Sequence, residues 1–342
     1  MIPLGLSLGV SPREDMRRFI QLAKAAEDRG IDTFWVIDSQ LAMKDAYVAL
    51  SIGLWETERL KFGTGVTNLI TRDITVTANA MATLSDIGQG RALLGLGAGD
   101  SAVFPLGLEP SRIKDLSRGM TDLRHLLHGQ EVQLRPDLSA RLSFTPTHYP
   151  PIYLAASRPR MLDLAGRVAD GVIVMGPANA ETARGQIEAV RHGEQEAGRP
   201  AGSTVIDLWV TIAIDHGDGS AVNDVRSWAS AQARHMSHWG TLPSSLEQFK
   251  DEMEDAAKTY EFSQHLSLQA GHASSVSNDL ARALAVAGTP DQCATRLREL
   301  IATGPDRITC TLLSKGREHR LDEIAKLWTV LGNPETASVD TC

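Results

Sequence analysis

The sequence predicts an α/β fold in which parallel strands close into a (β/α)8 TIM barrel with insertions. Short apolar runs alternate with amphipathic helical segments along nearly the whole chain. Each strand-helix unit is too short to bury its own faces, and closing the sheet inside a ring of helices satisfies all of them. The competing open sheet would need GxGxxG after its first strand, and Gly5 and Gly9 do not supply that motif. We therefore expect one barrel domain spanning residues 1–342.

Composition narrows the possible functions. Hydrophobic residues make up 42% and charged residues 22% of the 342 residues, which are globular values. The formal net charge of −8 and the absence of Lys/Arg clusters argue against a nucleic-acid partner. The cysteines, Cys293, Cys310 and Cys342, form no CxxC pair, so we expect passive thiols in a reducing compartment, the cytoplasm. The N-terminal MIPLGLSLGV lacks a basic segment and is too short to span a membrane, so it is interpreted as a strand.

The first two units follow directly. Residues 3–9 form the first strand, and Ser11 with Glu14 predicts a capping box that starts a helix ending at Gly30. Residues 33–37 (TFWVI) are β-branched and aromatic, which predicts the second strand, and a helix follows over residues 45–56.

The stretch from Leu60 to Ala102 organises the rest of the prediction. It contains a strand over residues 62–66, an amphipathic helix over 74–87 and a second strand over 92–96. Small and polar residues follow both strands. Parallel strands bind ligands at their carboxyl ends, so we expect the chemistry there.

The remaining units continue the alternation, with two interruptions. Residues 131–146 predict a hairpin excursion around a Pro136-Asp137 turn, and the polar tract 240–279 predicts an insertion between the seventh and eighth strands. Thr289 with Gln292 forms a second capping box. Four tryptophans are expected in the core: Trp35, Trp55, Trp209 and Trp328. The expected strands are 152–156, 171–175, 205–214 and 307–313, and the expected helices are 113–127, 158–169, 178–198, 221–238, 289–302 and 321–331.

Four segments carry a family resemblance. They are WVIDS (residues 35–39), GVTNLITRDITVTANAMATLSDIGQGRALLGLGAGDSA (65–102), PIYLAASRPRMLDLAGRVADGVIV (151–174) and AGTPDQCATRLREL (287–300). Together they resemble the bacterial luciferase-like oxidoreductases, and particularly the methylenetetrahydromethanopterin reductase branch. The resemblance implies a barrel that holds coenzyme F420 or, alternatively, FMN at the carboxyl ends of its strands. It also implies a non-prolyl cis peptide bond, which would match Gly65-Val66.

The same resemblance proposes site residues. Asp38 lies where the family carries an acidic or polar group near the ring, as a catalytic or cofactor-binding residue, and Ser39 replaces the histidine of some relatives. Asp38 could equally cap a turn, and Thr67 and Asn68 could cap the next helix instead of contacting the cofactor. The remaining cofactor candidates after these strands are Gly65, Val66, Gly97, Ala98, Gly99, Asp100 and Ser101.

A phosphate site is expected at the start of the fifth helix. Free backbone N–H groups there favour an anion, and Arg158 adds positive charge. Lys315-Gly316 is a rival site, in the position more usual for barrels, and Arg158 could instead be an exposed cap. The strand ends that would border this site contribute Ala155, Ala156, Ser157 and Gly176.

Histidines are expected to play a smaller part. The pairs His125/His128 and His235/His238 have i,i+3 spacing but no evident third ligand, so solvated helix faces are favoured over a metal site. His265, in the insertion, is the weaker catalytic candidate, since an insertion over the barrel mouth could reach the substrate.

The expected function is hydride transfer between F420 and a small organic substrate. The first alternative is a reduced-FMN-dependent monooxygenase, and the second is a flavin- or F420-binding protein without turnover. Family habit and apolar helix faces favour a homodimer, and no membrane partner is expected.

Overall fold

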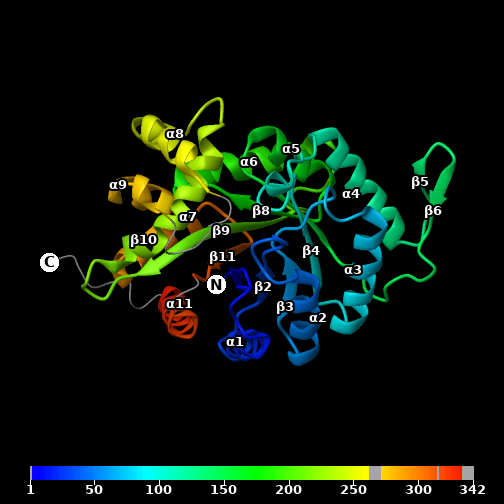
Figure 1. The fold of residues 1–342 in the computed structure, drawn as a ribbon, viewed down its shortest axis with the longest axis horizontal. Coiled ribbons are helices and arrows are strands. Elements are labelled where there is room, and N and C mark those ends of the chain that lie inside the picture. Colours follow the sequence, from blue (N-terminus) through cyan, green and yellow to red (C-terminus); the bar gives the residue numbers. More distant parts are fainter. Residues whose placement is uncertain (1, 262–270, 314–315, 333–342) are drawn as a thin grey trace.

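The computed structural model, which describes residues 2–261, 271–313 and 316–332, is a closed barrel of eight parallel strands ringed by helices (Figure 1). Pairing of β8 with β9 and of β11 with β1 closes the sheet. The predicted (β/α)8 barrel is therefore confirmed. Its strands are β1 (Leu4–Leu8), β2 (Thr33–Val36), β3 (Lys61–Thr64), β4 (Ala92–Leu96), β7 (Ile152–Ala156), β8 (Gly171–Met175), β9 (Val205–Ile214) and β11 (Arg307–Thr311).

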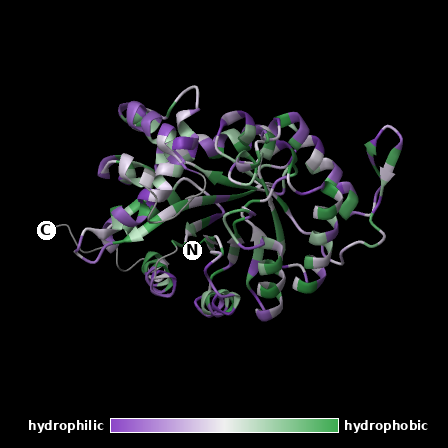
Figure 2. Cartoon of the chain, viewed as in Figure 1, coloured by the Kyte–Doolittle hydropathy of each residue, from purple (hydrophilic) through white to green (hydrophobic). Residues whose placement is uncertain are grey.

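The barrel strands are mostly apolar and are buried on both faces, which favours a closed parallel sheet. Every residue of β1, β2, β4 and β11 is buried. Phe34 of β2 packs against Phe62 of β3 with ring centroids 5.6 Å apart, and Phe19 meets Phe34 edge-on at 5.8 Å. The strands carry the hydrophobic residues at the centre of the molecule, and polar residues lie on the outer faces of the helices (Figure 2).

The ring of helices follows the predicted alternation. Thr289 and Gln292 form the predicted capping box at the start of α10. The ring helices are α1 (Met16–Asp28), α2 (Ala46–Glu56), α3 (Ile74–Gly88), α4 (Ile113–Leu127), α5 (Pro159–Val168), α6 (Ala180–Glu196), α7 (Ser220–Ser237), α10 (Pro290–Ile301) and α11 (Arg317–Gly332). None of the helices in the described ranges is long and apolar enough to cross a membrane.

The prediction that Ser11 caps the first helix is wrong. The Ser11 carbonyl accepts the Glu14 N–H at 3.0 Å in an isolated turn, and α1 begins later, with Asp15 as its N-cap. The Glu14 carboxylate pairs with Arg317 of α11, so it serves the contact between the first and last helices. Glu14 therefore binds Arg317, which is distant in the sequence, and does not complete a capping box with Ser11.

Two groups of elements depart from the barrel. An antiparallel hairpin, β5 (Val132–Arg135) and β6 (Leu138–Ala140), projects between α4 and β7 (Figure 1). The second group packs on α7 around Leu246, Met253 and Leu280 and forms a hydrophobic cluster separate from the main core. Its elements are η2 (Ser244–Phe249), α8 (Lys250–Thr259), η4 (Gly271–Ser275), α9 (Asn278–Leu284) and the short strand β10 (Val286–Gly288), which pairs in parallel with the end of β9.

The tryptophans divide between core and surface. Trp35, Trp209 and Trp328 are buried, as predicted, but Trp55 is 76% exposed. Helix α2 is apolar around its whole circumference, so one apolar side must face outward. Val48 lies on that side as well and is 54% exposed.

Candidate functional site

The site is a cavity of about 310 Å³ at the carboxyl ends of the barrel strands. Its walls come from the ends of β2, β3, β4, β7 and β8, from Trp209 in the middle of β9 and from one side of α7. The structure brings every sequence-predicted cofactor-binding residue to this cavity. They are Asp38, Ser39, Gly65, Val66, Thr67, Asn68, Gly97, Ala98, Gly99, Asp100, Ser101, Ala155, Ala156, Ser157, Arg158 and Gly176.

The floor of the cavity is the backbone that follows β3. The Gly65-Val66 peptide bond is cis, as predicted. The Thr67 N–H donates to the Gly95 carbonyl at 2.9 Å, and the Gly97 N–H donates to the Thr67 carbonyl at 2.9 Å. These bonds join the ends of β3 and β4 into one surface.

Two glycines allow this floor to exist. A Cβ on Gly65 would lie 2.8 Å from the Trp209 ring and 2.9 Å from the Trp35 Cβ. A Cβ on Gly95 would lie 2.1 Å from the Thr64 carbonyl oxygen. Glycine is required at both positions because the backbone approaches its neighbours too closely for a side chain.

Asp38 is the best-connected polar residue of the floor. Its carboxylate accepts hydrogen bonds from the Thr67 hydroxyl at 2.6 Å and from Arg72 at 2.8 and 2.9 Å. Asp38 is buried, at 4% exposure. Both carboxylate oxygens are therefore occupied, which suits a residue that positions the Thr67 backbone better than one that transfers protons.

Arg72 was not identified from the sequence. Its guanidinium also bonds Asp45 at 2.9 Å and lies 4.3 Å from the centroid of the Tyr47 ring. Burial alone would lower the pKa of Arg72, but the bonds to Asp38 and Asp45 raise it, so the side chain stays cationic. The residues next to Arg72 in the sequence do not indicate its role, because its partners Asp38 and Asp45 lie in a distant segment of the chain.

Polar residues after β2 and β3 form hydrogen bonds that hold the loops at the cavity in place. The Ser39 and Ser101 hydroxyls lie 2.5 Å apart, which links the ends of β2 and β4. The Asn68 side-chain oxygen accepts the N–H groups of Ile70 and Thr71, at 3.0 and 2.9 Å. Asp73, rather than Thr67 or Asn68, caps α3, and so the helix-capping alternative for Thr67 and Asn68 is wrong.

The phosphate candidate Arg158 is the N-cap residue of α5, with Pro159 in the first turn. Its side chain is exposed at the cavity, and it has no ion pair with the residues that the structure describes. Gln186 donates to the Ser157 and Met175 carbonyls, at 3.0 Å each, and so holds the ends of β7 and β8 together. The rival residue Lys315 lies outside the described residues.

Helix α7 supplies a wall that was missed. His235, predicted on a solvated helix face, is exposed, but it faces the cavity, and its Nε2 lies 3.4 Å from the Ser157 hydroxyl. The protein atoms that crowd His235 on the cavity wall lower its pKa, because they exclude part of the water that would stabilise the charged imidazolium, although the residue itself is exposed. The i,i+3/i+4 spacing along α7 is the sequence signal that could have revealed this wall. Its members are Trp228, Ala231, Gln232, His235, Met236 and, just beyond the helix, Trp239.

The other histidine predictions have different outcomes. His125 and His128 of α4 are exposed, and His128 stacks on Tyr149 at a centroid distance of 4.8 Å. His265 lies outside the described residues. The predicted catalytic roles of Asp38 and His265 remain predictions.

The Asp100 side chain is engaged with α7. Arg234 donates to both of its carboxylate oxygens, at 2.6 and 2.5 Å. The same guanidinium lies 5.1 Å from the centroid of the Tyr260 ring, just after α8. The loop after β4, α7 and the end of α8 are thereby joined at the edge of the cavity.

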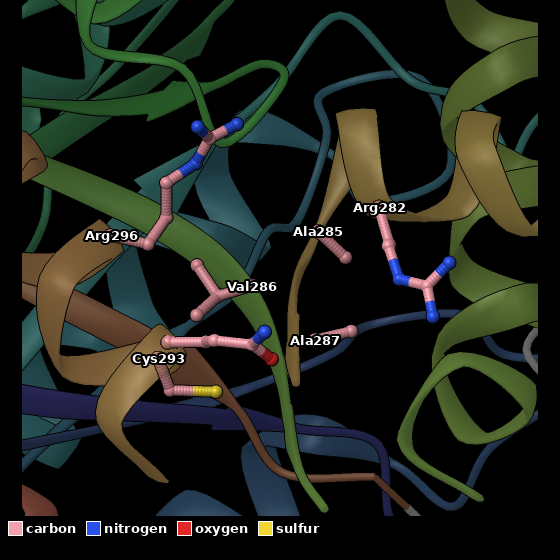
Figure 3. Close-up of a pocket in the computed structure, with 7 residues that line it drawn as sticks. Arg282, Ala285, Val286, Ala287, Cys293 and Arg296 are labelled. Atoms are coloured by element: carbon pink, nitrogen blue, oxygen red, sulfur yellow. The ribbon is translucent and has the colours of Figure 1, made fainter. Parts of the chain in front are cut away.

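A smaller cavity, of about 220 Å³, lies beside β10, away from the barrel mouth. Figure 3 shows Arg296, Val286 and Cys293 on one side of this view and Arg282 on the other. The Cys293 thiol donates to the Gly288 carbonyl at 3.4 Å, and burial raises its pKa to about 11. Such a thiol is unreactive at neutral pH, which agrees with the expected passive role.

Comparison with known proteins identifies the family. Residues 2–307 match the family model described as luciferase-like monooxygenase. The chain belongs to the luciferase-like monooxygenase family. The predicted resemblance is therefore confirmed, and this luciferase-like chain is placed among oxidoreductases.

The curated relatives include a methylenetetrahydromethanopterin reductase and an F420-dependent dehydrogenase. The luciferase-like chain is 30% identical to the 5,10-methylenetetrahydromethanopterin reductase of Methanolobus tindarius over 310 residues, 87% of this chain and 90% of the relative. It is also 30% identical to the F420-dependent glucose-6-phosphate dehydrogenase of Nakamurella multipartita, covering 68% of this chain and 74% of the relative.

Solved structures agree on the fold. The F420-dependent tetrahydromethanopterin reductase of Methanopyrus kandleri superposes with a TM-score of 0.79 at 22% identity, over 95% of this chain and 97% of that one. An F420-dependent secondary alcohol dehydrogenase gives 0.77 at 20% identity, over 96% and 99%.

Proposed function

We propose that this chain is an F420-dependent oxidoreductase that transfers hydride between the deazaflavin and a small organic substrate. The single observation that carries the proposal is the shape and charge of the mouth cavity. The backbone floor at Gly65-Val66 lies in the same cavity as Arg158, which has no ion-pair partner among the described side chains. A planar ring with an anionic tail matches that combination, and relatives named for F420 support it.

The residues present fit the cofactor. Gly65 and Gly97 line the cavity without a side chain, so a ring can approach the backbone closely there. The Asn68 side-chain oxygen is used within its own turn, which leaves the amide N–H groups for the ring edge. Arg158 and the N-terminal N–H groups of α5 would hold the phosphate. F420, when bound, supplies the two-electron hydride chemistry.

The protein's own contribution is a dry pocket and a proton carrier. Trp209, Met175 and Trp239 line the cavity with apolar surface that excludes water. His235 faces the same space, and its lowered pKa suits a neutral imidazole that accepts a proton from a substrate oxygen or nitrogen. In the reverse direction the imidazolium returns that proton.

The alternative function is a reduced-FMN-dependent monooxygenase. The description of the matching family favours it, because the family is named for monooxygenases. The same floor would accept either ring, so cofactor identity separates the two functions.

The test is equilibrium titration of the purified chain with F420, reduced F420, FMN and reduced FMN, followed by absorbance. We expect F420 to bind and Arg158→Gln to weaken it about 10-fold, the effect of one charge-assisted hydrogen bond. Arg160→Gln, on the same helix but outside the cavity, is the matched control. Tight FMN binding without F420 binding would favour the monooxygenase, and F420 binding without turnover across a broad substrate screen would favour a carrier.

The role of His235 is tested separately. His235→Gln should lower kcat for substrate oxidation by about 10²-fold or more and remove the rise of rate with pH, while F420 affinity is unchanged. His238→Gln, beyond the cavity, is the control. Unchanged kcat in His235→Gln would refute the proton-transfer role.

We propose further that the chain is a homodimer that pairs through α2 and α3. Val48, Trp55 and Val76 of these neighbouring helices are 54%, 76% and 58% exposed, so three large apolar side chains face outward. Sedimentation should show a dimer for the wild type and a monomer for Trp55→Lys. A wild-type monomer would refute this arrangement.

A further inference from the structure

A group of metal-ligating side chains lies outside the cavity and is unused by the proposed function. His319 and Glu323 lie one turn apart on α11, and His216 lies in the loop between β9 and α7. The His319 Nε2 is 3.1 Å from the Glu323 Oε1, and the His216 Nε2 hydrogen-bonds the same oxygen. The three ligand atoms all lie within 4.8 Å of one another.

This arrangement differs from an ordinary surface ion pair. The Glu323 side chain is only 10% exposed, whereas the His216 and His319 side chains are 60% and 74% exposed. The carboxylate is thus held in place by the protein, and the imidazoles approach it from the solvent side. An open side remains for water as a further ligand.

Nearby cations are engaged elsewhere. Arg18 pairs with Glu318 at 2.9 Å, and Arg320 pairs with Asp224 at 2.5 Å. Within the described ranges, the ion-pair partners of Glu323 are the two histidines. The carboxylate therefore offers negative charge to the point where two imidazole nitrogens converge.

The donor set selects the kind of ion. Two imidazole nitrogens and one carboxylate oxygen suit Zn²⁺ and similar first-row divalent ions, while Ca²⁺ and Mg²⁺ prefer oxygen ligands alone. The i,i+4 spacing of His319 and Glu323 places both side chains on one face of α11.

We propose that His216, His319 and Glu323 form a Zn²⁺ site that joins α11 to the loop preceding α7. The Arg320-Asp224 pair already connects the same two helices, so the ion would fix a junction that the fold has aligned. Helix α7 also carries His235, and the ion would stabilise the wall of the mouth cavity from outside without touching its ligands.

Isothermal titration of tag-free, chelator-treated full-length protein with ZnCl₂ tests this site. We expect one Zn²⁺ per chain and a higher Tm with the ion present. His216→Gln and His319→Gln should each weaken binding by at least about 10-fold, since even outer-sphere substitutions have effects of that size. Both side chains are exposed, so these variants should fold.

His192→Gln is the matched control. His192 is also an exposed histidine beside a carboxylate, 3.0 Å from Asp163, and the histidines of the site are elsewhere. Zn²⁺ binding that survives in His192→Gln and is lost in the two site variants supports the proposal. Absence of binding to the wild type, or equal binding to wild type and site variants, overturns it. Neither result depends on F420.

Discussion

The barrel contains an aspartate-arginine pair at its mouth and another in its interior, and the two pairs have the same chemical groups but different roles. At the mouth, Asp38 binds Arg72, whose side chain is 22% exposed and shared with Asp45. Inside, Asp207 is completely buried and accepts from Arg307 at 3.1 Å, from Thr309 at 2.6 Å and from the Trp35 indole N–H at 2.9 Å.

The difference lies in access to water and to the cavity. Burial raises the pKa of Asp207 against the opposing effect of Arg307. Asp38 instead has one side on the cavity and holds Thr67 of the floor. The inner pair maintains the packed interior, whereas the mouth pair shapes a surface for a ligand. Removing a partner should therefore affect stability most at the inner pair and ligand binding most at the mouth.

The largest effect is expected for Asp207→Ala. Among the described residues, this change leaves buried Arg307 with Asp32 as its ion-pair partner, and breaking a buried pair typically lowers the free energy of unfolding by about 3–5 kcal/mol. Urea unfolding followed by circular dichroism measures the loss. Asp137→Ala, at the exposed hairpin turn, should change stability little. A loss below about 1 kcal/mol for Asp207→Ala would contradict the role assigned to the inner pair.

A smaller effect on stability is expected for Arg72→Ala. It leaves Asp38 buried without its cation, with an expected loss of about 1.5–3 kcal/mol for charged hydrogen bonds. The displaced floor should also weaken cofactor binding. Parallel measurements of urea unfolding and ligand titration separate the two consequences, and Arg59→Ala, on an exposed loop, serves as the control. Unchanged cofactor affinity would show that the mouth pair only stabilises the fold.

The smallest expected effect is on how stability depends on pH, and it involves Asp45, which shares Arg72 with Asp38. Burial would raise the pKa of Asp45, but bonds from Arg72 and the Val48 N–H lower it below the ordinary 3.8. The unfolded chain then binds more protons near that pH, so this contribution to stability is present above about 3.8 and lost as pH falls through the folded-state pKa. Asn at position 45 can still cap α2, so Asp45→Asn should mainly make the fall in Tm between about pH 5 and 3 less steep, since the Asp45 carboxylate takes up its proton in that range. An equally steep fall in Tm for the wild type and the variant would argue against this contribution of Asp45.

Local sequence was enough to predict the barrel and half of the cavity. Gly65, Val66 and Asp38 follow buried strands, and strand ends meet at one edge of a parallel sheet whatever the details of packing. Their position therefore follows from chain order alone.

The missed residues depend on contacts between distant segments. The sequence assigns no role to Arg72, because its contacts form only when the fold brings Asp38 and Asp45 to it. The spacing along α7 marks the face that carries His235, but only the fold shows that this face turns toward the barrel mouth rather than toward solvent. The Ser11 cap failed for the same reason, since Glu14 binds Arg317 of the last helix.

The tryptophans at the mouth give the protein an optical property. Trp209, Trp228 and Trp239 line the cavity, so a bound ring that absorbs where indole emits will take up their excitation energy. Trp55, on the outer surface of α2, does not line the cavity, so its emission should change less. A fall in the intrinsic fluorescence of this chain should therefore report that the cavity is occupied.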